Sequence, residues 1–117
     1  MSRCTVINMA NILGKKWTIP LLQEVESNGS KGFNAILRRM KMRPKTLSDR
    51  LKELQMNGIV GKDFVKENNV LKTSYHLEDK GKSFMNIITG LKKWNEKYNK
   101  VGVKCSDRNC IDCPVYL

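Results

Sequence analysis

The stretch from Pro44 to Gly58 constrains the fold most, because it specifies both ends of one helix and the face that this helix buries. Proline suits the first helical position, where a backbone N–H would have no partner. Glycine is favoured just beyond a helix C-terminus, which is where Gly58 stands. Leu47, Leu51 and Leu54 recur at helical spacing. The helix therefore buries a leucine face and leaves the opposite face in water.

After this helix the hydrophobic period changes from 3.6 residues to 2. Residues 59–66 and 70–77 are typical of two strands, joined at residues 67–69 by a turn in which Asn tolerates positive φ. The lone His76 falls on the polar side of the second strand. We expect a solvated histidine there, without a catalytic role. One face of that strand carries Leu71, Thr73, Tyr75 and Leu77, and the other carries Lys72, Ser74, His76 and Glu78.

Apolar residues at helical spacing predict four more helices. The second runs from about Trp17 to Val25, with Pro20 either in its first turn or at a kink. The last begins near Asp79, which could cap it. The first, third and last helices are defined by Val6, Ile7, Ala10 and Leu13; by Phe33, Ile36, Leu37 and Met40; and by Phe84, Ile87, Ile88, Leu91, Trp94 and Tyr98.

This order of elements predicts a mainly α fold with a β-hairpin (α+β), a winged helix-turn-helix. The length of 117 residues fits one compact domain. We assign residues 1–100 to DNA binding and dimerisation, and residues 101–117 to a cysteine-containing tail. No apolar run is long enough for a membrane span, and the N-terminal segment lacks a signal-peptide cleavage site, so we expect a cytoplasmic protein.

The formal net charge is +11, and it is concentrated. Residues 31–52 contain eight Lys or Arg and a single Asp. A basic surface of this kind favours a polyanion such as nucleic acid. An enzyme is disfavoured, since the sequence has neither a nucleotide-binding glycine loop nor a paired carboxylate site.

The face opposite the leucines is the candidate DNA-reading surface. The major groove of B-DNA admits one helix, and short polar side chains near its N-terminus can reach base edges. Arg50 lies nearer the leucines, so it either braces the fold or touches phosphate. An alternative is a basic RNA-binding or architectural protein without operator choice. The candidate DNA contacts are Lys31, Arg38, Arg39, Arg43, Lys45, Thr46, Ser48, Asp49, Arg50, Lys52, Lys62, Lys66 and Lys72.

Four motifs together resemble the HxlR-type transcriptional regulators: GKKWT at 14–18, GFNAILRRM at 32–40, LSDRLKELQMNGIV at 47–60 and YHLEDKGK at 75–82. The resemblance implies a homodimeric winged-helix regulator that pairs through its terminal helices. In the alternative, the apolar stripe of the last helix is buried within the monomer. The residues expected at the dimer interface are Val6, Ile7, Phe84, Ile88, Leu91 and Trp94.

The C-terminal tail holds Cys105, Cys110 and Cys113, and Cys4 lies near the N-terminus. The C-x2-C spacing suits two corners of a zinc site, and the whole set also resembles iron–sulfur ligation with Cys4 as a fourth ligand. A thiol–disulfide switch and unliganded thiols are the alternatives. No cofactor is fixed by the spacing. Cysteine-based redox or metal sensing is the leading hypothesis for the signal.

Overall fold

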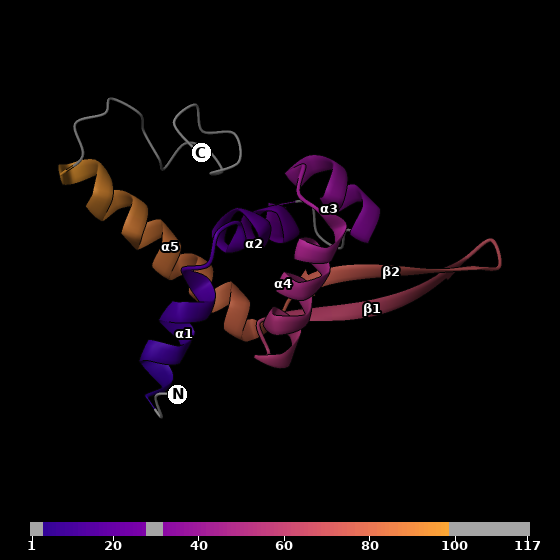
Figure 1. Ribbon diagram of the computed structural model, residues 1–117, viewed down its shortest axis with the longest axis horizontal. Coiled ribbons are helices and arrows are strands. Elements are labelled where there is room, and N and C mark those ends of the chain that lie inside the picture. The colour runs from indigo at the N-terminus through magenta and orange to yellow at the C-terminus, as the bar shows by residue number, and fades with distance from the viewer. Residues whose placement is uncertain (1–3, 28–31, 99–117) are drawn as a thin grey trace.

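A computed structural model of the protein describes residues 4–27 and 32–98. It confirms the predicted mainly α architecture with one β-hairpin, a winged helix-turn-helix (Figure 1). The elements are α1 (Thr5–Leu13), α2 (Thr18–Ser27), α3 (Phe33–Met40), α4 (Pro44–Met56), β1 (Val60–Glu67), β2 (Val70–Leu77) and α5 (Asp79–Tyr98).

The hydrophobic core lies among α2, α3, α4 and the base of the hairpin. The three leucines of α4 are at most 1% exposed, as the sequence predicts. They share one cluster with Leu21 and Leu22 of α2, which are fully buried. Burial of a leucine side chain contributes about 1.5–3 kcal/mol, so this face fixes the orientation of α4.

Both ends of α4 lie where Pro44 and Gly58 predict them. Pro44 occupies its first turn. Gly58 has φ +71°, a left-handed conformation that glycine adopts without strain. The N–H of Ile59 then donates to the Leu54 carbonyl at 2.9 Å, which closes the helix end. Pro20 lies in the first turn of α2, since that helix begins at Thr18.

The hairpin turn is shorter than the sequence indicated. Glu67 pairs with Val70, so only Asn68 and Asn69 form the turn. Their φ angles are 51° and 63°. Two central residues with positive φ define a type I′ turn, whose twist matches that of the flanking strands. The predicted turn of three residues, 67–69, is therefore one residue too long, because Glu67 still pairs in the strand ladder.

The hairpin extends well beyond the core as a wing, on the side of the molecule away from α1 and α5 (Figure 1). The predicted alternation of buried and exposed residues therefore holds only at its base. Tyr75 and Leu77 are 5% exposed, whereas Leu71 is 65% exposed. Phe64 on β1 is also largely exposed.

His76 departs from the expected solvated side chain. Its Nδ1 lies 2.7 Å from Oδ2 of Asp63, and its Nε2 lies 3.0 Å from Oε1 of Glu78. The Nε2 contact with Glu78 is a hydrogen bond, whereas Nδ1 is buried beside Asp63 and makes no hydrogen bond within the described residues. Sequence alternation placed it correctly on the polar side but could not reveal the two carboxylates. Asp79 is the first residue of α5 rather than its cap, since the carbonyl of Glu78 accepts from the Lys82 N–H at 2.9 Å.

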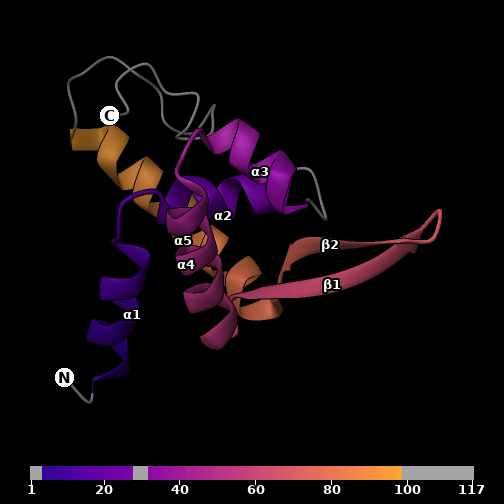
Figure 2. The ribbon, with the colours of Figure 1, turned by 45° about the vertical axis from the view of Figure 1, so that its right-hand side comes forward.

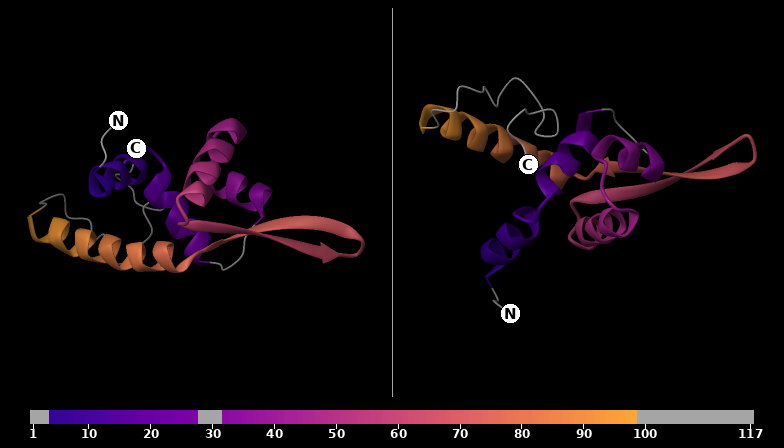
Figure 3. Two further views of the ribbon diagram at one scale, coloured as in Figure 1. Left: turned by 90° about the horizontal axis from the view of Figure 1, so that it is seen from below. Right: turned by 45° about the horizontal axis from the view of Figure 1, so that its top comes forward.

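The outer parts of the terminal helices extend away from the helix-turn-helix, whereas the first half of α5 packs against the core through Met85 and Ile88. Figures 2 and 3 show α1 projecting from the body and α5 running away from the wing. In α1 only Leu13 is buried. Within residues 4–27 and 32–98, no helix is long and apolar enough to cross a membrane.

Candidate nucleic-acid interface

α3, a short turn and α4 form the helix-turn-helix. Lys41 ends α3 in the left-handed conformation, with φ 55°, and its N–H donates to the Leu37 carbonyl at 2.9 Å. Met42 is 9% exposed and anchors the turn in the core. Arg43 and Pro44 then start α4. The two helices are therefore held in a fixed relation by backbone geometry and one buried side chain.

The outward face of α4 carries the residues that the sequence placed opposite the leucines. Lys45, Asp49 and Lys52 are exposed. Thr46 and Ser48 are half-buried on the flanks. Because the leucine face is fully packed, these side chains project from a rigid helix. This arrangement suits insertion into a groove about one helix wide.

A recess of about 390 Å³ lies beside the start of α4, lined by Trp17, Lys41, Met42, Arg43 and Thr46. In the described part of the chain, the Arg43 side chain makes no capping hydrogen bond to α4. A helix N-terminus of this kind attracts anions, and two cations border it. Trp17 and Lys41 were not among the predicted site residues. The charge cluster contained Lys41, but no local signal placed Trp17 near α4.

Arg39 has a packing role that the sequence did not indicate. Its Nε lies 3.3 Å from both carboxylate oxygens of Glu24 on α2. Glu24 is 2% exposed, whereas the Arg39 side chain is 44% exposed. A buried carboxylate needs such a partner. Arg39 therefore joins α3 to α2, and any contact with DNA would be additional to this pairing.

Arg50 lies on the leucine side of α4, as expected. The side chain is half-buried and its Nε is fully buried. Within the described residues this Nε has no hydrogen-bond partner, so its burial supports the bracing alternative through packing alone. Arg38, in contrast, is exposed on α3.

Three lysines of the wing are exposed. The Nζ of Lys62 lies 5.5 Å from the ring centre of Phe64 and 5.9 Å from that of Tyr75. Lys72 lies 3.6 Å from the carboxylate of Glu67, which reduces the local charge. Lys66 pairs with Leu71 in the ladder, close to the turn. Lys31, also a predicted contact, lies outside the described residues.

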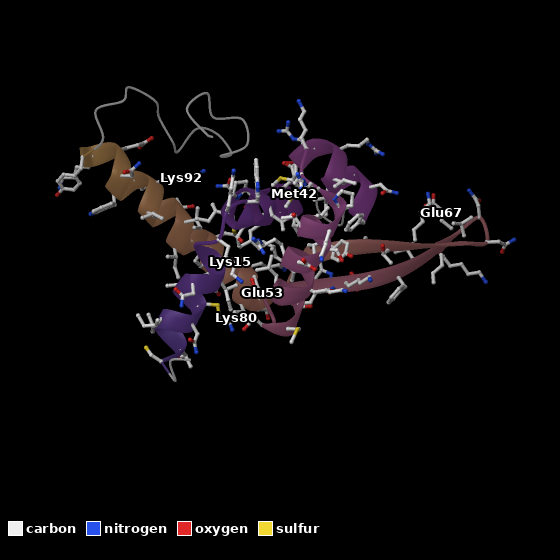
Figure 4. All side chains as sticks on the ribbon, viewed as in Figure 1. Lys15, Met42, Glu53, Glu67, Lys80 and Lys92 are labelled. Atoms are coloured by element: carbon white, nitrogen blue, oxygen red, sulfur yellow. The ribbon has the colours of Figure 1, made fainter. Side chains whose placement is uncertain are left out.

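Two lysines from other elements fix the far half of α4 (Figure 4). The Nζ of Lys15 lies 2.7 Å from Oε2 of Glu53. The Nζ of Lys80 on α5 donates to the carbonyl of Asn57 at 3.0 Å. The helix that carries the candidate reading face is thus tied to the segment after α1 and to the start of α5.

The residues predicted at a dimer interface separate into two groups. Val6, Ile7, Leu91 and Trp94 are 49–73% exposed. Phe84 is half-buried and packs against the core, and Ile88 is 4% exposed. Ile88 is therefore corrected to an internal residue of the protomer, because its position on α5 faces the body. The exposed stripe of α5 consists of Ile87, Leu91, Trp94 and Tyr98.

The structure describes one of the four cysteines. Cys4 is exposed at the position before α1. Cys105, Cys110 and Cys113 lie outside the described residues. Within residues 4–27 and 32–98, no group of three or more Cys, His, Asp or Glu is arranged to hold a metal ion. The zinc and iron–sulfur hypotheses therefore stay predictions.

A helix-turn-helix with a packed leucine face, a polar outer face and a two-stranded wing defines a winged-helix DNA-binding protein. The chain belongs to the HxlR-like helix-turn-helix family, whose family model matches residues 12–102. Members of this family are DNA-binding regulators of transcription rather than enzymes, and this chain is such a regulator.

Relatives and solved structures agree with this assignment. The uncharacterised regulator YvaP of Bacillus subtilis is 35% identical over 85 residues, which cover 72% of this chain and 77% of YvaP. The regulator YodB of the same organism is 32% identical over 93 residues, 79% of this chain and 81% of YodB. The reduced form of YodB superposes with a TM-score of 0.73 at 29% identity, over 87% of this chain and all of that one. The redox regulator HypR in its reduced form superposes with a TM-score of 0.70 at 26% identity. The match covers 84% of this chain and 96% of the HypR chain.

Proposed function

We propose that the regulator acts as a homodimer that reads an inverted-repeat operator. The observation that carries this proposal is the outward face of α4, presented by a leucine face that is at most 1% exposed. In a twofold dimer, two such helices enter successive major grooves of one DNA face. A regulator of this kind acts where the chromosome lies, so we also propose a cytoplasmic location.

Exposed apolar residues support the pairing. Ile87, Leu91, Trp94 and Tyr98 recur on α5 at spacings of four, three and four, so they form one stripe. Val6 and Ile7 on α1 add exposed apolar area. Large apolar surfaces on a small protein typically mark an interface. The stripe lies away from the wing, so pairing there leaves α4 accessible (Figure 1).

The two functional parts of the DNA surface would act differently. Lys45 and Ser48 stand on α4 where side chains can reach base edges. Arg38 and Lys66 lie on α3 and the wing, where they suit phosphate contacts. The recess at the start of α4, with Lys41 and Arg43, would take a phosphate of the same backbone.

A footprint on DNA flanking the gene tests this function. We expect two protected half-sites related by a twofold axis, with centres about 10 bp apart or a multiple of that spacing. Uniform protection along any DNA, or an isolated half-site, would contradict the reading of an inverted repeat. Competition with random DNA separates operator choice from bulk charge attraction.

Cysteine-based redox sensing is the proposed signal. Support comes from the relatives: YodB was solved in reduced and diamide-treated forms, and HypR in reduced and oxidised forms. Cys4 is exposed beside α1, which carries part of the proposed dimer surface. Two thiols that form a disulfide release two protons and pass two electrons to the oxidant. If such a disulfide constrained α1, it would alter the distance between the two α4 helices of the dimer.

The sensing proposal is tested by operator affinity before and after diamide, and again after a reductant. We expect a reversible change of several-fold in the wild type. Cys4→Ser should remove the response if this thiol is the sensor, and Cys110→Ser with Cys113→Ser should remove it if the tail is. A protein with all four cysteines replaced that responds as the wild type does would exclude thiol chemistry. Metal analysis of the purified protein tests the zinc and iron–sulfur alternatives.

A further inference from the structure

The outer half of the wing exposes apolar side chains that no described helix covers (Figures 1 and 3). Single exposed apolar residues are ordinary, but a group of them on a small protein marks an interaction surface. The wing lies away from the stripe of α5 that we assign to pairing, so a homodimer leaves this group open (Figure 1). The group consists of Phe64 (62% exposed), Val65 (48%), Val70 (55%) and Leu71 (65%).

The register of the hairpin sorts these residues onto two faces. Residues directly opposite each other in an antiparallel ladder share a face, and the next pair lies on the other face. Phe64 pairs with Thr73, and Leu71 pairs with Lys66, so these four residues share one face. Phe64 and Leu71 are diagonal neighbours there, close enough for their side chains to meet. We call this the inner face of the wing, because at the base of the hairpin it continues into the core through Tyr75, which is 5% exposed.

Charge differs between the inner face and the opposite, outer face. The inner face carries Lys62 and Lys66, both exposed, and neither acid of the two strands. The outer face carries both of those acids, Asp63 and Glu67. The carboxylate of Glu67 also lies 3.6 Å from the Nζ of Lys72, which shares the outer face. A polyanion is therefore attracted to the inner face rather than to the outer one.

An occupant of the inner face must accept an aromatic ring and an ammonium together. The Nζ of Lys62 lies 5.5 Å from the ring centre of Phe64, so a partner that covers the ring also meets this charge. An apolar groove of another protein would have to bury the ammonium without a partner, which is costly. The minor groove of DNA has base edges and sugars at its floor and phosphates along its rims, so it can receive both groups.

The inner face is held beside the helix-turn-helix. A Cβ placed at Gly32, just before α3, would lie 3.1 Å from the carbonyl oxygen of Thr73. Thr73 is the cross-strand partner of Phe64, so the wing is packed against α3 up to the level of this ring. β1 also begins shortly after α4 ends. The wing therefore has a fixed position relative to α4 when that helix lies in a major groove.

We propose that Phe64, supported by Leu71, is an apolar wedge that enters the minor groove next to the major groove occupied by α4. The proposal rests on the insertion of α4 that is part of the proposed function. Lys62 and Lys66 bind phosphates at the rims, and the ring partly unstacks one base step between them. Phenylalanine and leucine side chains act in this way in proteins that bend DNA. The ring makes no hydrogen bond to a base, so it favours steps that unstack easily, such as T-A, over stiff A-tracts.

Fluorine NMR of protein labelled with 4-fluorophenylalanine tests the wedge without a change in the binding surface. The phenylalanines are Phe33, Phe64 and Phe84, and Phe64→Leu assigns the signal of the wing. We expect a duplex of alternating T and A to shift the Phe64 signal, and an A-tract duplex of equal length to shift it less. Phe33 and Phe84 are partly buried against the core and serve as internal references. Netropsin, which fills the minor groove of such duplexes, should abolish the shift.

Affinity for the alternating duplex gives a second readout. Phe64→Ala should weaken binding about fivefold to tenfold, because base–aromatic stacking is lost. Its salt slope should stay that of the wild type, since no phosphate contact is removed. Phe64 is 62% exposed, so this truncation leaves the core intact. Val65→Ala, on the outer face, is the matched control and should change the affinity by less than about twofold.

The possible results separate the wedge from its alternatives. An unmoved Phe64 signal, a shift that survives netropsin, or equal affinity of Phe64→Ala and the wild type would overturn it. A lower salt slope in Phe64→Ala would show that the ring only supports a lysine, which also overturns the wedge. If Phe64→Ala instead lowers the mass of the free protein in light scattering and leaves DNA affinity unchanged, the inner face is an interface between copies.

Failure of the wedge can be distinguished from failure of the proposed function. A Phe64 shift that netropsin abolishes, without an inverted-repeat footprint, supports the wedge and contradicts only the reading of an operator. A twofold footprint with an unmoved Phe64 signal supports the operator and overturns the wedge.

Discussion

At the scale of single residues, charge has two different roles in this protein. Most basic side chains of α3, α4 and the wing are exposed and can meet DNA. Arg39 instead lies against Glu24, which is 2% exposed. Truncating one partner of such a pair leaves a buried charge with less stabilisation. Basic residues next to each other in the sequence, such as Arg38 and Arg39, can therefore differ in role.

Arg39→Ala should lower the free energy of unfolding by about 1–3 kcal/mol, because it removes a partner of a buried carboxylate. Arg38→Ala is the matched control and should change it by less than about 0.5 kcal/mol. Urea unfolding of both variants without DNA measures the difference. Arg39→Ala with Glu24→Gln should recover part of the loss. Equal stability of the two single variants would show that the ion pair contributes little.

Tyr75 makes the free energy of unfolding depend on pH in the alkaline range. Burial raises the pKa of its phenol above the ordinary value of 10.0. The folded state therefore favours the neutral phenol more than the unfolded chain does. This contribution to stability is complete below about pH 10 and is lost as the pH rises through the folded pKa. Tyr75→Phe should show a shallower alkaline decline in the free energy of unfolding, and an identical decline would contradict the assignment.

At the scale of elements, the start of α5 packs closely against the backbone that follows α4. The N–H of Glu78 donates to the Ile59 carbonyl at 2.9 Å. Gly81 is buried, and a Cβ there would collide with that same carbonyl oxygen. The start of α5 therefore approaches the backbone after α4 more closely than a side chain would allow.

Two glycines of α5 should respond in opposite ways to alanine. Gly81→Ala should destabilise the fold by about 1–3 kcal/mol, since the methyl group forces the helix away from Ile59. Gly90→Ala should stabilise it by about 0.5–1 kcal/mol through helix propensity. Apart from the neighbouring residues and the nearby backbone of α5 itself, no described atom lies within 4 Å of a Cβ placed at Gly90. Thermal unfolding measures both variants, and a shift of the same sign in each would contradict the close approach at Gly81.

Some elements could be predicted from short stretches of sequence, and other features could not. α4 could be predicted because its proline, leucines and glycine all lie within one stretch of sequence. The hairpin followed from alternation and two asparagines. In contrast, the pairing of Arg39 with Glu24 joins residues fifteen apart on different helices, and the recess at α4 includes the distant Trp17. Periodicity also could not separate Ile88, buried in the protomer, from the exposed Leu91 on the same helix. These features depend on packing between elements, which no local pattern encodes.

At the scale of the whole molecule, α5 with its apolar stripe extends to the side opposite the wing, and α4 lies between them (Figure 1). Leu91→Asp should give a folded monomer, because Leu91 is 49% exposed and its replacement leaves the core intact. Ile88→Asp is the contrasting variant and should unfold, since it would bury a charge. Light scattering and circular dichroism report both results. A dimeric Leu91→Asp protein would place the interface elsewhere.

The central claim is that α4 reads sequence while α3 and the wing bind the backbone. The most direct test measures affinity for operator and random DNA across salt concentrations in four single alanine variants. Lys45→Ala and Ser48→Ala should each weaken operator binding by about 1–3 kcal/mol more than random binding. Arg38→Ala and Lys66→Ala should weaken both equally and reduce the salt slope by about one for each phosphate that is no longer neutralised. If all four variants weaken operator and random DNA alike, α4 does not read the sequence.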